Sequence, residues 1–151
     1  FTEFDLNISG IFGQINFNDD KNHLMFYCSY QDADNFRYQD GNESTSDMDR
    51  GYFQNKIKFS ITRIINNNAS AGFIMDLYKR SNNSTIPDDV LHYMRNHNDI
   101  TSTLWYKFGK HKIKFSYRDR KTSSPENWVS ELKTFKRYIL TYTFTLDKIK
   151  L

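Results

Sequence analysis

Hydrophobic and polar residues alternate with a period of two along most of this chain. In the stretch 53–62, Ile57 and Phe59 alternate with Lys56 and Lys58. Side chains of a β-strand point to opposite faces in turn, so each such stretch has one apolar face and one polar face. β-Branched and aromatic residues dominate these stretches, which is typical of strands. The sequence therefore predicts seven strands, at 3–12, 24–31, 53–62, 72–77, 100–108, 112–118 and 137–146.

The composition limits which all-β architecture fits. Only 38% of the 151 residues are hydrophobic, whereas about 45–50% is usual in soluble domains. The 13 Phe and 10 Tyr residues, with a net charge of only +3, argue against a disordered chain. The chain contains no run of about 18 apolar residues, the length that a membrane-spanning helix needs. Its single cysteine, Cys28, excludes an internal disulfide. The length favours one domain. Because the hydrophobic fraction is low, the architecture must let many polar side chains face an environment other than a hydrophobic core.

The links between the predicted strands alternate between short and long. Short links rich in turn-forming residues lie at 18–22, 66–70 and 109–111, and long polar segments lie at 31–50, 79–99 and 119–133. Weak helical character is confined to Asp88–Arg95 in the second long segment. This alternation places all the short turns at one end of the sheet. Transmembrane β-barrels have this arrangement, because their periplasmic turns are short and their extracellular loops are long.

The two faces of the predicted strands differ in charge. If the apolar face contacts lipid, the inward face has a cationic surplus, with Glu3, Asp5 and Asp76 as its acidic residues. The reverse assignment would place each lysine in hydrocarbon, at a cost of about 2–4 kcal/mol at the bilayer midplane. The residues expected to line the lumen are Lys56, Lys58, Asp76, Lys107, Lys112, Lys114, Arg118 and Arg137. Those expected to face lipid are Phe59, Ile61, Phe73, Leu104, Phe115, Leu140, Tyr142 and Phe144.

Tyrosines near the ends of the predicted strands match the aromatic girdles of membrane barrels. These tyrosines are Tyr30, Tyr52, Tyr78, Tyr106, Tyr117 and Tyr138. An alternative interpretation uses the same alternation. In a soluble β-barrel or sandwich binding module, the apolar faces would point inward and the lysines would face water.

The C-terminal part of the chain contains a recognisable pair of hairpins. A strand beginning near Asp99 is followed by the tight turn Gly109-Lys110-His111, the strand 112–120, a polar loop and a last strand, 137–146, that alternates aromatic and aliphatic residues. This pattern resembles the closing hairpins of Gram-negative outer-membrane β-barrels and, more loosely, the barrels that sheath multihaem cytochromes. The resemblance implies an antiparallel up-and-down transmembrane β-barrel whose last strand serves as the assembly signal.

Two features modify this expectation. Residues 147–151 continue past the terminal aromatic residue, and seven strands differ from the even number usual in bacterial barrels. Both are explained if residues 1–151, a single β-barrel domain, form the C-terminal part of a larger barrel. A missed or very short eighth strand, giving a small closed barrel, is the competing explanation.

No motif for catalysis or for cofactor binding is present. His92 and His97 share a long segment with Asp88, Asp89 and Asp99, but their spacing matches no metal-binding motif. The sequence contains no phosphate-binding glycine loop, nucleophile elbow or Cys/His pair. It therefore predicts no enzyme, no cofactor and no metal site.

The basic runs at 110–114 and 118–121 are interpreted as one face of a strand, because a net charge of +3 is weak for binding nucleic acid. The expected partners are the lipid bilayer, small polar or anionic solutes and, if the lumen is plugged, a protein plug or another subunit. The predicted function is a polar, mildly cationic channel in the bacterial outer membrane, or a sheath or scaffold for a partner there.

Overall fold

The computed structural model describes residues 5–36, 39–40, 43–44, 51–83, 96–122 and 133–146. These residues contain strands and turns and no helix. The chain is all-β, as the alternation predicts. The weakly helical segment Asp88–Arg95 lies outside the described residues.

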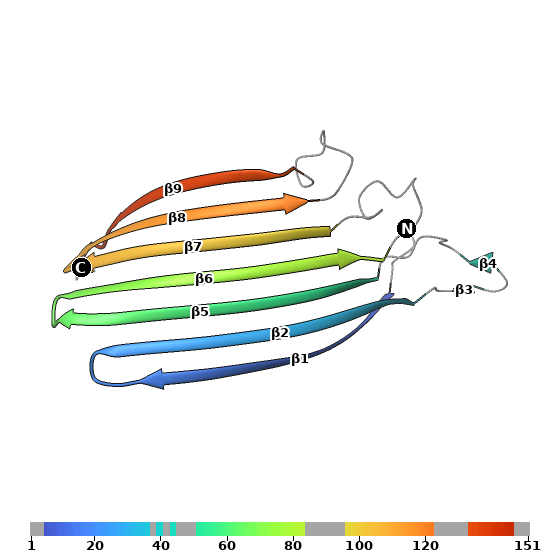
Figure 1. Ribbon diagram of the computed structural model, residues 1–151, viewed down its shortest axis with the longest axis horizontal. Coiled ribbons are helices and arrows are strands. Elements are labelled where there is room, and N and C mark those ends of the chain that lie inside the picture. Colours follow the sequence, from blue (N-terminus) through green and yellow to red (C-terminus); the bar gives the residue numbers. More distant parts are fainter. Residues whose placement is uncertain are drawn as a thin grey trace, which may run out of the picture.

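Seven long strands form one antiparallel sheet in sequence order, β1-β2-β5-β6-β7-β8-β9 (Figure 1). A separate pair of two-residue strands, β3 (Gln39–Asp40) and β4 (Glu43–Ser44), lies between β2 and β5 along the chain. The prediction of seven long strands is therefore confirmed. Their bounds are β1 Asp5–Asn18, β2 Asn22–Phe36, β5 Tyr52–Asn66, β6 Ala69–Asn82, β7 Asn96–Phe108, β8 His111–Thr122 and β9 Phe135–Phe144.

The connections between these strands are sorted by length. Strands are joined at one end of the sheet by the short turns 19–21, 67–68 and 109–110, and at the other end by the long segments 37–51, 83–95 and 123–134 (Figure 1). The predicted sorting is confirmed, but the predicted loops began too early. β2 runs on to Phe36, β6 to Asn82 and β8 to Thr122, because strand pairing continues where the sequence becomes polar on both faces.

Local hydrogen bonds fix the short turns. The Asp19 carboxylate accepts hydrogen bonds from the backbone N–H groups of Lys21 (2.7 Å) and Asn22 (2.6 Å) and from the Asn22 side chain, which together lower the pKa of Asp19. Gly109 has a φ of 55°, a left-handed conformation that glycine adopts without steric cost. Its N–H also donates to the Asn68 carbonyl at 2.8 Å, so two neighbouring turns are joined.

The strand register assigns every residue to one of two faces, since directly opposed residues lie on the same face. We call the face that carries Ile57, Phe59 and Ile61 of β5 the apolar face. The face that carries Lys56 and Lys58 is the polar face. The apolar face contains one hydrogen-bonded row that is hydrophobic on all seven strands: Phe17, Leu24, Ile61, Phe73, Leu104, Phe115 and Leu140.

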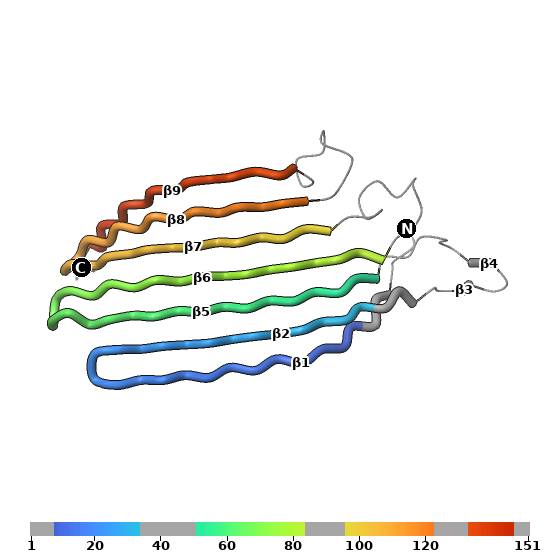
Figure 2. Tube along the Cα trace, viewed as in Figure 1, coloured from blue at the N-terminus to red at the C-terminus, as the bar shows by residue number. Residues whose placement is uncertain are grey.

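The sheet is open in the described part of the chain. β1 and β9 lie at opposite edges, and the extensive contacts of the described long strands are with their neighbours in the sheet order (Figure 2). The closed barrel expected from the sequence is therefore not observed. Because the strands are antiparallel throughout, the first and the seventh run in the same direction.

The register corrects the predicted faces of β1. Ile8 and Phe12 were expected on the apolar face, but their register places them on the polar face, where Phe12 pairs with Ser29. Asp5 was also expected inward, but its backbone pairs with Phe36 in the register of the apolar face, and Glu3 lies outside the described residues. The prediction was wrong because β1 is hydrophobic on both faces: Ile11, Ile15 and Phe17 occupy its other parity.

A close approach on the polar face depends on Gly72. The Trp105 side chain of β7 lies over this glycine of β6, so that a Cβ added at residue 72 would meet three indole atoms at 2.6 Å. The ammonium group of Lys112 lies over the same indole ring, 4.8 Å from its centroid. Gly72 therefore allows Trp105 to lie flat against the sheet.

Replacing this glycine tests the packing. We expect Gly72→Ala to lower the free energy of unfolding by about 1–3 kcal/mol, because the indole must move away from the sheet. Gly13→Ala is the matched control, since the nearest atom to its added Cβ is the Cys28 sulfur at 3.9 Å. Urea unfolding of the detergent-solubilised variants measures both. Equal stabilities of the two variants would contradict this account.

Candidate functional site

The two faces have an exposure pattern opposite to that of a soluble domain. Large hydrophobic side chains on the apolar face are exposed, with Leu104 at 58% and Leu140 at 73%. On the polar face, Thr103 and Ser116 are buried and their hydroxyl groups are hydrogen-bonded at 3.0 Å. Among the described residues the buried hydrophobic side chains are only Ala33, Tyr52 and Ala69. The described sheet therefore has no hydrophobic core of its own.

Most of the exposed hydrophobic side chains form a band on the apolar face, which we call the apolar belt, whereas Ile8, Phe12 and Ile139 are exposed on the polar face. It extends on the apolar face from Ile11, Ile15 and Phe17 on β1 to Tyr138, Leu140, Tyr142 and Phe144 on β9. All eight residues predicted to face lipid lie on the apolar face by register. Of the predicted girdle tyrosines, Tyr52 and Tyr78 lie instead on the polar face, whereas Tyr30, Tyr106, Tyr117 and Tyr138 lie on the apolar face.

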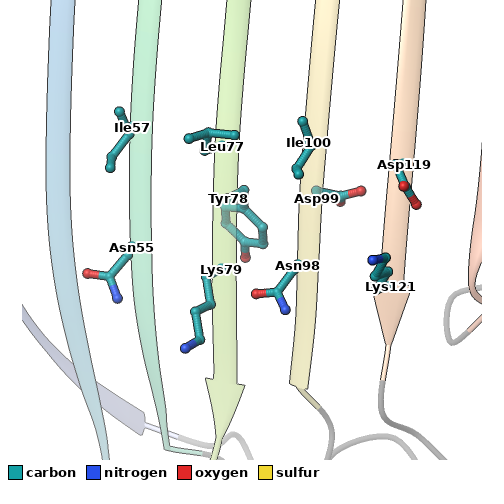
Figure 3. A pocket seen from close by; sticks show the side chains of 10 residues that line it. All are labelled: Asn55, Ile57, Leu77, Tyr78, Lys79, Asn98, Asp99, Ile100, Asp119 and Lys121. Carbon is teal, nitrogen blue, oxygen red and sulfur yellow. The ribbon is translucent and has the colours of Figure 1, made fainter.

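The belt gives way to polar side chains on the side of the long connections, with Phe53 of β5 as an exposed hydrophobic residue beyond this edge. A shallow groove of about 460 Å³ marks this edge over β5 to β8. Figure 3 shows Ile57, Leu77 and Ile100 at one level of the groove. The next level, toward the long connections, holds the polar side chains of Asn55, Lys79, Asn98 and Lys121.

This edge crosses the hydrogen-bonded rows obliquely. On β1 the belt ends at Ile11, which is followed toward the long connections by Ser9. On β9 it ends at Tyr138, which lies in the same row as Ile15 of β1. Between the two edges of the sheet the belt is therefore displaced by four residues along the strands, the separation of Ile11 and Ile15.

The polar face gathers the predicted cationic residues. All eight residues predicted to line a lumen lie on this face by register. Sequence reasoning missed Arg80, His97, Asp99 and Arg120 as members of the same face, because it compared the two faces only over 72–77, 100–108 and 112–118. The parity itself was the available signal, since Arg120 follows Arg118 by two residues. Nine basic and two acidic residues of the described chain lie on the polar face: Lys56, Lys58, Arg80, Lys107, Lys112, Lys114, Arg118, Arg120 and Arg137, with Asp76 and Asp99.

Asp99 is the centre of the strongest polar contacts on this face. Its carboxylate is 7% exposed as a residue and accepts hydrogen bonds from Arg118 at Nε (3.1 Å) and Nη2 (2.7 Å). Arg120 donates from Nε (3.1 Å) and Nη2 (3.0 Å) to the same Oδ2 atom. Charge-assisted, two-point contacts of this kind hold guanidinium groups in a fixed orientation. One carboxylate therefore positions two arginines of β8.

Phe135 provides a second support for the arginines. The guanidinium groups of Arg118, Arg120 and Arg137 lie 5.5, 5.2 and 5.0 Å from the centroid of its ring. These distances are within the range of cation–π attraction, which acts without neutralising the charge. The three arginines thus keep their positive charges close together across β8 and β9.

Hydrogen bonds extend the polar network toward β2. The Tyr78 hydroxyl donates to Oε1 of Gln54 at 2.8 Å, and Nε2 of Gln54 donates to Oε1 of Gln31, also at 2.8 Å. The Tyr78 ring also stacks obliquely on His97, with centroids 5.2 Å apart. Contacts between side chains therefore link β2, β5, β6 and β7 on the polar face.

Between these groups lies a depression that we call the basic basin. Its volume is about 460 Å³. Its lining residues are Lys56, Lys58, Asp76, Tyr78, His97, Asp99, Thr101, Arg118 and Arg120. Four basic and two acidic side chains give it a formal charge of +2 with His97 neutral. Such a basin can attract small anions.

Of the histidines and acids considered for a metal site, the structure describes Asp99 and His97, and both have other contacts. Asp99 is occupied by two arginines, and His97 lies beside Tyr78. His92, Asp88 and Asp89 lie outside the described residues. Within the described ranges, no group of three or more His, Cys, Asp or Glu side chains is arranged to hold a metal ion.

Comparisons with protein-family models, with curated proteins and with solved structures found no match. Within the described ranges there is no helix of the length and hydrophobicity needed to cross a membrane. The function is therefore argued from the two faces of the sheet, since a fold class by itself does not define an activity.

The role of Asp99 can be tested by removing its charge. We expect Asp99→Asn to lower the free energy of unfolding by about 2–4 kcal/mol, because two half-buried guanidinium groups lose their counter-charge. Asp76→Asn is the matched control on the same face. Asp76 forms no ion pair with other described residues, so its replacement should change stability by less than about 0.5 kcal/mol. Thermal unfolding of both variants in detergent provides the comparison, and similar losses would contradict the central role of Asp99.

Proposed function

We propose that this chain forms part of the wall of a transmembrane β-barrel in the bacterial outer membrane. In this proposal the apolar face contacts lipid and the polar face lines a water-filled lumen. The observation that carries the proposal is the exposed apolar belt opposite a half-buried, charged network. Water would penalise the belt at about 25 cal/mol per Å² of apolar surface, whereas lipid would not.

The dimensions of the strands support the same proposal. A tilted membrane-spanning β-strand needs about 9–11 residues, and the seven long strands have 10 to 15 residues. The sorting of short turns to one end and long connections to the other also matches bacterial outer-membrane barrels. The short turns would then lie on the periplasmic side.

The oblique apolar belt is further support. Barrel strands tilt by about 35–45° from the barrel axis. A hydrophobic band that lies parallel to the membrane must then cross the hydrogen-bonded rows at an angle. The displacement between Ile11 on β1 and Tyr138 on β9 has this character.

Closure of such a barrel requires further strands. The edge strands β1 and β9 run in the same direction, so antiparallel closure needs an odd number of additional strands between them. A second copy in the same membrane orientation would offer only parallel edges. We therefore propose that strands of different sequence complete the barrel, with residues 1–151 as its C-terminal part.

The lumen of this barrel would be cationic. Nine basic and two acidic residues on the polar face would raise the local concentration of small anions, and salt would weaken the effect. We propose a passage for small polar and anionic solutes. If a partner protein fills the lumen, the same residues would pair with acidic groups of that partner, and the barrel would act as a sheath or scaffold.

The single cysteine provides a direct test of which face meets lipid. Cys28 is exposed and lies on the apolar face opposite Ile57. In lipid vesicles we expect a charged, membrane-impermeant maleimide not to label Cys28 in the folded protein, because the thiol lies in hydrocarbon. Denaturation in urea and detergent should restore labelling, measured by mass spectrometry.

A neighbouring position supplies the matched control. In the double variant Cys28→Ser/Ser29→Cys the thiol moves to the polar face, opposite Lys56. The maleimide should label this variant in vesicles through the lumen. Labelling of the wild-type protein in vesicles as fast as in the unfolded state would contradict the lipid contact. A protein that is monodisperse in buffer without detergent would favour the soluble binding module instead.

Conductance tests the passage. In planar bilayers we expect the full-length barrel to conduct with a preference for anions, and Lys112→Glu/Lys114→Glu to shift the reversal potential toward cations, because four units of charge change on the polar face. Raising the salt concentration should reduce the difference between the two proteins. Inserted protein that conducts no ions would rule out the passage and leave the sheath or scaffold.

A further inference from the structure

The basic basin contains cationic groups that the protein itself does not neutralise. Lys56 and Lys58 form no ion pair or hydrogen bond through their side chains with other described residues. Arg118 uses Nε and Nη2 for Asp99, which leaves its Nη1 group without a described hydrogen-bond partner. All three side chains line the same depression.

The basin is also partly organised before any ligand enters. Arg118 is hydrogen-bonded to Asp99 and lies 5.5 Å from the Phe135 ring centroid, and the hydroxyl of Tyr78, which lines the basin, donates to Gln54 of β5. Thr101 adds a hydroxyl group to the lining. A fixed guanidinium group presents planar, paired donors that match an oxyanion, whereas a lysine contributes a mobile point charge.

The charge of the basin indicates the valence of its ligand. Asp76 and Asp99 leave a surplus of two positive charges among the lining residues, and Arg137 lies directly opposite Arg118 on β9. A divalent anion would neutralise this surplus, whereas a monovalent anion would leave half of it. The volume of about 460 Å³ is large enough for a small hydrated oxyanion.

We propose that the basic basin is a binding site for tetrahedral oxygen dianions of the phosphate and sulfate class, held by Lys56, Lys58 and Arg118. This inference deepens the proposed function, since it assigns a substrate class to the proposed lumen. In an anion passage, divalent oxyanions would bind at this site, and the bound dianion would slow the flow of chloride.

Binding of radioactive sulfate to the refolded protein in a nonionic detergent tests the site. At constant ionic strength, held with chloride, we expect one saturable sulfate site per chain. Lys56→Gln/Lys58→Gln should weaken sulfate binding at least tenfold, because two of the three unneutralised donors are lost. Lys107→Gln/Lys114→Gln is the matched control, since it removes the same charge from the same face outside the basin.

The outcomes separate a site from a general electrostatic attraction. Little change in the control variant supports the basin. An equal loss in both variants, or displacement of sulfate by equivalent chloride, overturns it. Competition by inorganic phosphate supports a dissolved oxyanion, whereas competition only by micelles that contain phosphatidic acid would overturn that assignment in favour of a lipid headgroup.

Failure of this inference and failure of the proposed function are distinguishable. Anion-selective conductance without saturable sulfate binding would refute the site and leave the passage. Saturable sulfate binding in a barrel that conducts no ions would support the site and refute the passage. The wild-type comparison of sulfate with chloride needs no variant, so a misfolded double mutant does not prevent the test.

Discussion

Pairing of backbone N–H and C=O groups between neighbouring strands is the interaction on which the described structure depends. The extensive contacts of each long strand are with its neighbours in the sheet, and the described residues bury almost no large hydrophobic side chains. In water, backbone hydrogen bonds contribute little net stability because water competes for the same groups. In hydrocarbon an unpaired backbone group costs several kcal/mol. Under the proposed function the apolar belt would contact lipid, and the open edges at β1 and β9 would have to pair with further strands.

Specific side-chain contacts occur on both faces. On the apolar face they include the ring contact of Phe115 with Tyr138 and the hydrogen bond between His111 and Tyr142 at 2.7 Å. On the polar face, charges of like sign stand close together and require counter-charges or aromatic support. Asp99 and Phe135 meet this need for the arginines of β8 and β9. Asp99 and Phe135 offset the repulsion among the arginines without cancelling all of their charge, so the basic basin keeps a positive surplus.

Much of this arrangement could be predicted from the alternation of residues. The seven strands and the division of Lys58 from Phe59 follow from a period of two, because neighbouring side chains of a strand must point to opposite faces. The sorting of turns follows from the lengths and turn-forming residues of the links. The alternation failed on β1, where hydrophobic residues occupy both parities and Ile8 gives no sign of its face. It also failed to connect Asp99 with Arg120, because residues 21 apart in the sequence meet only through the register of β7 and β8.

The sequence by itself determined the local geometry: extended strands, tight turns at Asp19 and Gly109, and a separation of charged from hydrophobic side chains on each strand. Only the tertiary structure decided which residues share a row, that the apolar belt is oblique, and that one aspartate binds two arginines. The physical reason is that alternation is a property of one strand, whereas rows depend on the relative displacement of neighbouring strands. That displacement is set jointly by the turns and the backbone ladder, and a single strand does not encode it.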